Sequence, residues 1–577
     1  MTLKGLRNLL IAVPPLLICL LVFKNGVDVP FLDEWDGTAP LFEKMIAGTL
    51  GFADFFAQHN EHRILFPRLI AFGLGRLTHW NIRAELFVIW FLALVCLFNI
   101  WQLAERSGPA KSSFWILFSS SVLVFSPLSF ENFLWGFQIG FLLPLACLTA
   151  CIWIAPYVRR PFNFVLAIVL CTICTFSIAS GFTSWLLTTP LLALGKTRST
   201  SSKKWWAVWL GSFLFEMIAY FYGYEKPANH PSMLWSLGHP IVAVEYILAF
   251  LGTPFSYGTN LPPLSVGMGM GGLLILLLLT AMVYIWRRRD DGELVANCLP
   301  WLMLAMVAVS TAILTMIGRS EFGAVQAQTS RYVTYAVMLP IALLGLVRLV
   351  RLQGTGSLFE QRQPPMRAAS LLLLSLFILT TCLSFVADLP VWPVFHQTRL
   401  YAKALVSFIN VVPEPEALAR RVFPYDGRVQ TAAKALNRIG YLHPPLLQSN
   451  LVRKVADPAS SGSPSFGEFY LTERKPGQVE VAGHAFLPES ARPADAVLIT
   501  YDNDDGEPLI FAIASIAIPR ESQLRVAWDS SSLPSGWKYD LPVDRLPERH
   551  QFLLKAWSYD AEIGRAYRLQ GSETVTR

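Results

Sequence analysis

The stretch VGMGMGGLLILLLLTAMVYIWRRR, residues 266–289, decides the class of fold. Its first 21 residues carry no charged side chain, and three arginines follow directly. A helix needs about 20 apolar residues to cross the hydrocarbon core of a bilayer, and Lys and Arg accumulate in cytoplasmic loops. The stretch therefore predicts a transmembrane helix whose C-terminal end lies in the cytoplasm.

The composition extends this prediction to much of the chain. Of 577 residues, 53% are hydrophobic and 15% charged, which is too apolar for a soluble enzyme. Apolar runs of similar length recur up to about Ala387 and are absent from the 190 positions after it. A membrane domain should therefore precede a water-soluble one. The net charge of +7 fits basic cytoplasmic loops, so no nucleic-acid partner is expected.

Eleven spans are predicted, with every basic cluster between them on one side. Leaving residues 241–257 as an external or re-entrant helix preserves this pattern, whereas counting them as a span would place Arg287 to Arg289 outside. The chain is expected to be a multi-pass protein of the bacterial inner (plasma) membrane, with a cytoplasmic N-terminus and a periplasmic C-terminal part. The spans are residues 8–23, 84–103, 113–129, 137–156, 162–180, 182–195, 205–223, 266–286, 296–317, 332–351 and 368–387.

Three domains follow: a transmembrane domain over residues 1–387, a periplasmic helical connector over 388–465 and a periplasmic β-sandwich over 466–577. Short runs of alternating polarity, separated by turn residues such as Asp505-Gly506, indicate the sandwich. Its strands are expected at residues 478–486, 496–501, 509–518, 523–528 and 551–559. Its Trp528, Trp537 and Trp557 could stack on sugar rings or fill the core.

Polar residues collect in the predicted periplasmic loops, where ionisable groups at a membrane edge are costly and tend to be functional. The candidate site residues are Asp33, Glu34 and Asp36, then His59, Glu61, His62 and Arg63, then Glu131 and Gln138, and finally Arg319, Arg331 and Tyr332.

Asp33 and Asp36 are spaced to point the same way from a helical turn. A carboxylate with other carboxylates nearby has a raised pKa suited to proton transfer, which makes a general base one interpretation. A solvated loop, or an N-cap for a helix from Gly37 onward, is the alternative.

His59 and His62 flank Glu61, yet the spacing matches neither HExxH nor HxxEH and supplies at most two metal ligands. We interpret these residues as a hydrogen-bonding cluster, with no metal or cofactor required and a divalent metal left open. Arg319 and Arg331 stand at the two ends of one external loop, where they could grip a lipid phosphate or extend to headgroups.

Four motifs in this order resemble the GT-C superfamily of polyprenyl-phosphate-sugar-dependent membrane glycosyltransferases. The similarity is to bacterial members that end in a periplasmic β-domain, and it covers residues 1–390 well and the β-domain more loosely. The motifs are Asp33-Glu34-Trp35-Asp36, Asn60-Glu61-His62-Arg63 with Phe66-Pro67-Arg68, Glu131-Asn132 with Trp135-Gly136-Phe137-Gln138, and Gly318-Arg319 with Ser330-Arg331-Tyr332.

The resemblance implies inverting sugar transfer from a polyprenyl-phosphate donor to a periplasmic glycan or lipid-linked acceptor, at the surface of membrane lipids. It implies Asp33 as catalytic base and Glu34 as the residue that orients the acceptor, and the remaining candidates would bind substrate. Two rivals stay open, a lipid or polysaccharide transporter or flippase and a non-catalytic envelope assembly protein. A transporter should carry charges near mid-span, and Glu216 is an exception among nearly charge-free spans.

Overall fold

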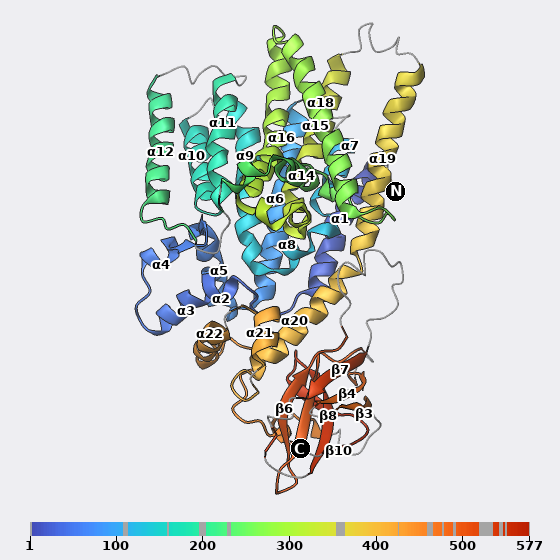
Figure 1. Cartoon of the computed structure of the whole chain (residues 1–577). Helices are drawn as coiled ribbons and strands as arrows, with labels where there is room; N and C mark the ends of the chain where they lie inside the picture. The colour runs from blue at the N-terminus through green and yellow to red at the C-terminus, as the bar shows by residue number, and fades with distance from the viewer. Residues whose placement is uncertain are drawn as a thin grey trace. The chain divides into compact units, whose positions relative to one another are not determined.

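The structure is a computed structural model of the full chain, and it is mostly helical with strands near the C-terminus (Figure 1). It describes residues 3–107, 114–157, 161–194, 203–227, 232, 234–353, 364–412, 414–424, 426–458, 466–475, 478–488, 492–517, 535–541, 546–547 and 551–575. Lys111, Arg159, Arg160, Lys196, Arg198 and Arg362 of the predicted basic clusters lie outside these ranges.

The chain forms two compact units, which we call unit 1 and unit 2. Unit 1 comprises Met1–Lys24, Phe52–Ile70 and Glu85–Leu389. Unit 2 comprises Asn25–Gly51, Ala71–Ala84 and Pro390–Arg577. The first predicted external loop is therefore divided between the two units.

Unit 1 is built from helices. They are α1 (Leu3–Asn25), α4 (Phe52–Phe56), α5 (Leu65–Thr78), α6 (Ile82–Arg106), α7 (Phe114–Val124), α8 (Phe130–Leu134), α9 (Ile139–Ile154), α10 (Pro161–Thr175), α11 (Thr183–Leu194), α12 (Lys203–Phe221), α13 (Trp235–Gly238), α14 (Pro240–Gly252), α15 (Pro263–Arg287), α16 (Gly292–Arg319), α17 (Val333–Ala336), α18 (Met338–Gln353) and α19 (Pro364–Asp388). The C-terminal part of α5, from Ala71, and the start of α6, up to Ala84, belong to unit 2.

Eight segments in the described ranges are long and apolar enough to cross a bilayer, as expected of a multi-pass membrane protein. They are Gly5–Asn25, Ile82–Arg106, Phe114–Leu134, Gly136–Ile154, Pro263–Arg287, Gly292–Phe322, Ser330–Val350 and Leu372–Ser407, and each overlaps a predicted span. The three other predicted spans fall on α10, α11 and α12, of 15, 12 and 19 residues.

The segment excluded from the predicted spans, residues 241–257, forms the short helix α14. Its 13 residues, at about 1.5 Å each, reach roughly 20 Å, less than the ~30 Å of a bilayer core. It packs closely on α15, because a Cβ atom added to Gly252 would lie 1.8 Å from the carbonyl oxygen of Gly267. Small residues permit such backbone contact between helices in lipid.

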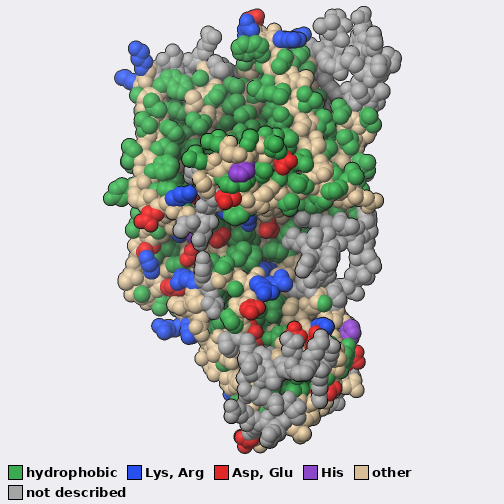
Figure 2. All heavy atoms as spheres, viewed as in Figure 1, with side chains coloured by type: hydrophobic (Ala, Val, Ile, Leu, Met, Phe, Trp, Pro, Cys, Tyr) green, Lys and Arg blue, Asp and Glu red, His purple; other side chains and the backbone are tan. Residues whose placement is uncertain are grey.

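Hydrophobic side chains cover most of the visible surface of unit 1 (Figure 2). Exposed apolar residues line the outer faces of several helices, including Leu20 of α1, Phe215 of α12 and Leu276 of α15. Apolar exposure on this scale is unusual for a soluble protein and is typical of contact with lipid.

Unit 2 contains helices α2 (Glu34–Gly37), α3 (Ala39–Ile46), α20 (Val391–Ser407), α21 (Pro415–Arg421) and α22 (Asp426–Arg438). Its strands are β3 (Gly467–Lys475), β4 (Gln478–Ala485), β5 (Ala496–Asp502), β6 (Pro508–Ala514), β7 (Gly536–Leu541), β8 (Phe552–Asp560), β9 (Arg565–Arg568) and β10 (Glu573–Val575).

These strands form two antiparallel sheets, one ordered β10-β8-β5-β6 with β9 also paired to β8, and one ordered β3-β4-β7. One apolar core joins side chains of both sheets, among them Val481, Val497 and Trp537. Strands β4, β5, β6 and β8 coincide with predicted strands, whereas the predicted strand 523–528 and Trp528 lie outside the described residues. Asp505-Gly506 forms the turn of the β5–β6 hairpin, as predicted.

Candidate functional site

Glu61 stands at the tip of a two-strand hairpin in unit 1. Strands β1 (Gln58–His59) and β2 (His62–Arg63) pair His59 with His62, so Asn60 and Glu61 make the turn. Asn60 has a φ of 48°, a left-handed conformation that Asn adopts more easily than most residues.

Arg319, the last residue of α16, binds this carboxylate. Its Nη2 lies 2.8 Å from Oε1 of Glu61, and the two side chains are 29% and 24% exposed. A ligand can therefore reach the pair. An arginine in the last turn of a helix is also favoured by the helix dipole.

The His62 ring lies beside the same carboxylate. Its Nδ1 accepts the backbone N–H of Ala179 at 2.9 Å. In the neutral ring the proton must then sit on Nε2, which lies 3.5 Å from Oε1 of Glu61. Glu61 is thus held by a guanidinium and an imidazole, and Tyr220 donates its hydroxyl to the Glu61 carbonyl at 2.7 Å.

The Arg63 side chain binds backbone carbonyl groups. It is 5% exposed, and its guanidinium donates to the carbonyls of Tyr220 (2.6 Å), Phe56 (3.1 Å) and Tyr222. A planar guanidinium suits such convergent donation. The sequence predicted that Arg63 binds substrate, and in the structure its guanidinium donates to three backbone carbonyl groups.

Two loops of unit 1 interlock beside Arg331. The backbone N–H of Arg331 donates to Oε2 of Glu131 at 3.1 Å, and that of Glu131 donates to Oγ of Ser330 at 3.2 Å. Asn132 donates to the Arg331 carbonyl at 2.9 Å. Glu131 therefore fixes the backbone that presents Arg331, a role that its sequence position did not indicate.

Gln326 joins Tyr332 and Tyr246, and Arg331 lies over the Tyr332 ring, 5.6 Å from its centroid. Tyr332 stacks on Phe250 with ring centroids 5.3 Å apart, and Gln326 donates to its hydroxyl at 3.1 Å. Tyr246 of α14 donates to Gln326, and Arg319 and Arg331 both act electrostatically on its hydroxyl. Arg319, at the end of α16, and Arg331, in the turn Ser330–Tyr332, thus both lie within electrostatic range of this phenol. Sequence reasoning missed Tyr246 because it lies in an apolar helix.

Gln138 and His59 are buried in the same unit, at 1% and 5% exposure. Oε1 of Gln138 has no hydrogen-bond partner among the described residues. The His59 ring packs against Phe137 with centroids 5.2 Å apart.

Asp33, Glu34 and Asp36 belong to unit 2. Asp33 is half-buried at the N-cap of α2, Asp36 is exposed, and Glu34 is 1% exposed. Oε2 of Glu34 accepts the Phe31 N–H at 2.7 Å. Asp33 and Asp36 lie on one helical turn, as their spacing suggested, whereas the Glu34 carboxylate supports the turn from below.

Glu216, the acidic residue inside a predicted span, bonds to neighbouring helices. Thr172 of α10 donates to its Oε1, and Trp185 of α11 donates to its Oε2 at 3.0 Å. The carboxylate thus ties α10, α11 and α12 together.

Among the described residues no group of three or more His, Cys, Asp or Glu side chains could hold a metal ion.

Comparison of the chain with models of known protein families, with curated proteins and with solved structures gave no match. The fold defines the class of the protein: it is a membrane protein with many apolar helices and a C-terminal β-region.

Proposed function

We propose that this protein is an inverting glycosyltransferase that moves a sugar from a polyprenyl-phosphate donor to a glycan or lipid-linked acceptor in the bacterial cell envelope. The proposal includes a place in the inner membrane, an external β-domain and membrane crossing by α10, α11 and α12, which would bring the spans to eleven. The order of the four motifs supports membership of the GT-C superfamily.

The observation that carries the proposal is that Arg319, at the end of α16, and Arg331, in the turn Ser330–Tyr332, stand at the two ends of one segment and both act electrostatically on the Tyr246 hydroxyl. Guanidinium groups bind phosphate through paired donors. In the transfer step the acceptor oxygen forms a bond to the anomeric carbon as the bond from that carbon to the phosphate oxygen breaks. The two arginines stabilise the negative charge that collects on the departing polyprenyl phosphate.

The acceptor hydroxyl must lose its proton as it attacks. Asp33 takes this role in the proposal, as a half-buried carboxylate on the first turn of α2. Glu61 is the alternative base, since a donor phosphate that engages Arg319 would release the Glu61 carboxylate. His62 keeps Glu61 oriented. The proposal needs no metal or organic cofactor, and a divalent metal can be tested by addition and chelation.

The test uses purified protein, a polyprenyl-phosphate sugar and a glycan acceptor, with release of free polyprenyl phosphate as the readout. Asp33→Asn should lower transfer by about 10²- to 10⁴-fold while keeping donor binding. Asp290→Asn, which changes an exposed carboxylate outside the candidate residues, is the matched control. Near-normal turnover in Asp33→Asn with loss in Glu61→Gln would move the role to Glu61. Absence of release with every donor and acceptor would favour a transporter or an assembly protein.

A further inference from the structure

Arg399, on α20 in unit 2, carries a charge that is buried at a cost in free energy. The side chain is 4% exposed, and its Nε and Nη1 have no hydrogen-bond partner among the described residues. Its Nη2 donates to the carbonyl oxygen of Arg421 at 2.7 Å. A buried charge with unpaired donors is unfavourable, and an apolar residue in its place is often equally or more stable. Stability alone therefore does not account for an arginine here.

The guanidinium lies against the segment that leads into α2. Its Cζ is 3.5 Å from the centroid of the Phe31 ring and 5.5 Å from that of Phe395. These two rings pack edge to face, with centroids 6.1 Å apart. Attraction between a cation and a ring is stronger away from water, and a planar guanidinium stacks where an ammonium cannot. Arg399 thus fixes the position of Phe31, two residues before Asp33.

The Phe31 backbone passes this constraint to residues 33–36, which we call the acidic turn. The Phe31 N–H donates to Oε2 of Glu34 at 2.7 Å. Glu34 also attracts the Arg399 guanidinium electrostatically. One side chain of α20 therefore acts on both ends of this hydrogen bond.

Arg399 also fixes the end of α21, which holds the same turn through the backbone. It binds the carbonyl of Arg421. The next carbonyl along the chain, that of Val422, accepts the Leu32 N–H at 2.9 Å. Leu32 has a φ of 44°, a left-handed conformation that persists in a leucine only where its surroundings hold it. The hydrogen bond to Val422 supplies this hold directly before Asp33.

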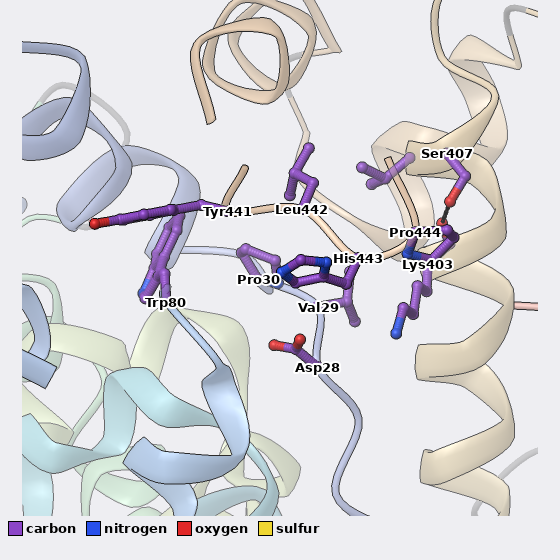
Figure 3. A pocket seen from close by; sticks show the side chains of 11 residues that line it. Asp28, Val29, Pro30, Trp80, Lys403, Ser407, Tyr441, Leu442, His443 and Pro444 are labelled. Carbon is purple, nitrogen blue, oxygen red and sulfur yellow. Dashed lines mark hydrogen bonds between the residues drawn. The ribbon is translucent and has the colours of Figure 1, made fainter. Parts of the chain in front are cut away.

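A second side chain of α20 acts on the chain just before the turn. Lys403 lies across a hollow from Asp28 (Figure 3) and attracts its carboxylate electrostatically. Oδ1 of Asp28 accepts the Ile82 N–H at 2.9 Å, which fixes that carboxylate. Because residues four apart lie on the same face of a helix, one face of α20 anchors the chain from Asp28 to Phe31.

We propose that Arg399 is a positioning residue that holds the acidic turn in the arrangement from which Asp33 acts. It works through the Phe31 ring and through the end of α21. One planar group must stack on a ring and donate to a carbonyl at the same time, which neither an ammonium nor an apolar side chain does. That Asp33 is a catalytic base rests on the proposed function, whereas the hold on the turn can be measured without it.

The first test is hydrogen–deuterium exchange, read by mass spectrometry, of the full-length protein in lipid nanodiscs. Arg399→Met keeps the length of the side chain and removes the planar donor. Amide exchange over residues 31–38 should become about tenfold faster, because a stacked cation and a hydrogen bond to a charged group are lost. Exchange over β5 should stay unchanged. Arg420→Met, at an exposed arginine that pairs with Glu416, is the matched control and should leave both segments unchanged.

The second test measures transfer by the same variants. Arg399→Met should lower kcat by about tenfold or more and leave KM for the donor unchanged, because a displaced base affects the chemical step and not donor binding. Its thermal midpoint should equal or exceed that of wild type, since a buried charge with unpaired donors is removed. Arg399→Lys should share the faster exchange and the loss of kcat.

Wild-type exchange over residues 31–38 in Arg399→Met would overturn the proposal. Faster exchange over β5 as well, with a lower thermal midpoint, would make Arg399 an ordinary structural residue. Full function in Arg399→Lys would show that charge suffices without stacking, and faster local exchange with unchanged kcat would exclude a role in transfer. If wild type releases no polyprenyl phosphate, or if Asp33→Asn turns over normally, the proposed function or its base fails, and exchange alone decides whether Arg399 holds the turn.

Discussion

Nη2 of Arg319 lies 2.8 Å from Oε1 of Glu61, although 258 positions separate the two residues in sequence. The pair joins the β1–β2 hairpin to the end of α16 within unit 1. Both side chains remain about one quarter exposed, so water and ligands reach them. A pair this accessible contributes about 0.2–1 kcal/mol to stability at most.

Glu61→Gln should therefore change activity far more than stability. We expect the thermal midpoint to stay close to wild type, because the pair is solvent-screened. Transfer should fall by at least about tenfold, since Arg319 loses its charged partner and its orientation. Glu416→Gln, which breaks the exposed pair with Arg420, is the control and should leave both quantities unchanged. Parallel losses of activity and stability would mean that the pair is only structural.

Arg331→Lys should lower transfer by about tenfold or more while keeping the charge, because an ammonium cannot reproduce paired donation to phosphate. The matched control is Arg287→Lys on the exposed end of α15. Turnover measured over a range of donor concentrations separates binding of the donor phosphate from binding of lipid headgroups. If lysine works as well as arginine at position 331, Arg331 is an anchor to lipid headgroups.

Gly75→Ala should destabilise unit 2. A Cβ atom there would lie 2.5 Å from Cζ of Phe42, whose ring also packs on Phe72 at 5.1 Å. Overpacking of this kind costs about 1–3 kcal/mol. Gly73→Ala on the same helix meets nothing within 4 Å and should be neutral or slightly stabilising. Thermal unfolding of both variants checks the contrast, and equal midpoints would contradict the packing around Phe42.

Asp495 should make unit 2 less stable as the pH rises. Burial raises its pKa to about 6, against the opposing charge of Arg492. Between pH 4 and 6 the folded state therefore binds more protons than the unfolded state, and the free energy of unfolding falls with pH across that range and is level above it. From pH 5 to 7.5 the loss is roughly 1 kcal/mol.

Thermal unfolding of wild type and Asp495→Asn at the two pH values measures this effect, because the asparagine does not titrate. Wild type should lose stability relative to the variant at pH 7.5. A relative gain would mean that the ion pair with Arg492 outweighs burial.

The C-terminal end of the chain should lie outside the cytoplasm. A reporter active only in the periplasm should be active when fused after Arg577 and silent when fused after Arg289, because three exposed arginines, Arg287 to Arg289, stand at the C-terminal end of α15. Activity of the fusion after Arg289 would mean that the topology is inverted and that the candidate site faces the cytoplasm.

Sequence reasoning located the long apolar helices because hydrophobic length is a local property. The overlap of residues 266–286 with Pro263–Arg287 is an example. Prediction was weaker at α10 and α11, where Gly181 marks the break: a Cβ atom there would lie 1.8 Å from the Cys174 carbonyl oxygen. Strands β3 and β7 were not among the expected strands, and β9 and β10 were missed because four or fewer residues carry too little alternation to detect.

For the candidate sites, too, the sequence indicated single residues but not the contacts between them. The pattern of acidic and basic residues pointed to Glu61 and Arg319, yet it could not show that they pair, since pairing depends on the packing of distant segments. It predicted that Arg63 binds substrate. The sequence does not show which backbone carbonyl groups a guanidinium contacts, such as that of Tyr220. Trp537 and Trp557 proved to be buried, at 3% and 8% exposure, and not a surface for stacking sugars.

The make-up of unit 2 has a consequence for how the protein is synthesised. The Leu32 N–H donates to the Val422 carbonyl at 2.9 Å, so an early segment is completed by one translated nearly 400 positions later. While the ribosome adds the intervening helices, residues 25–51 must wait without their final neighbours. Nascent chains of this protein should pass through a protease-sensitive interval that closes only as the C-terminus emerges, and a chaperone on the same side of the membrane would then act on the first loop.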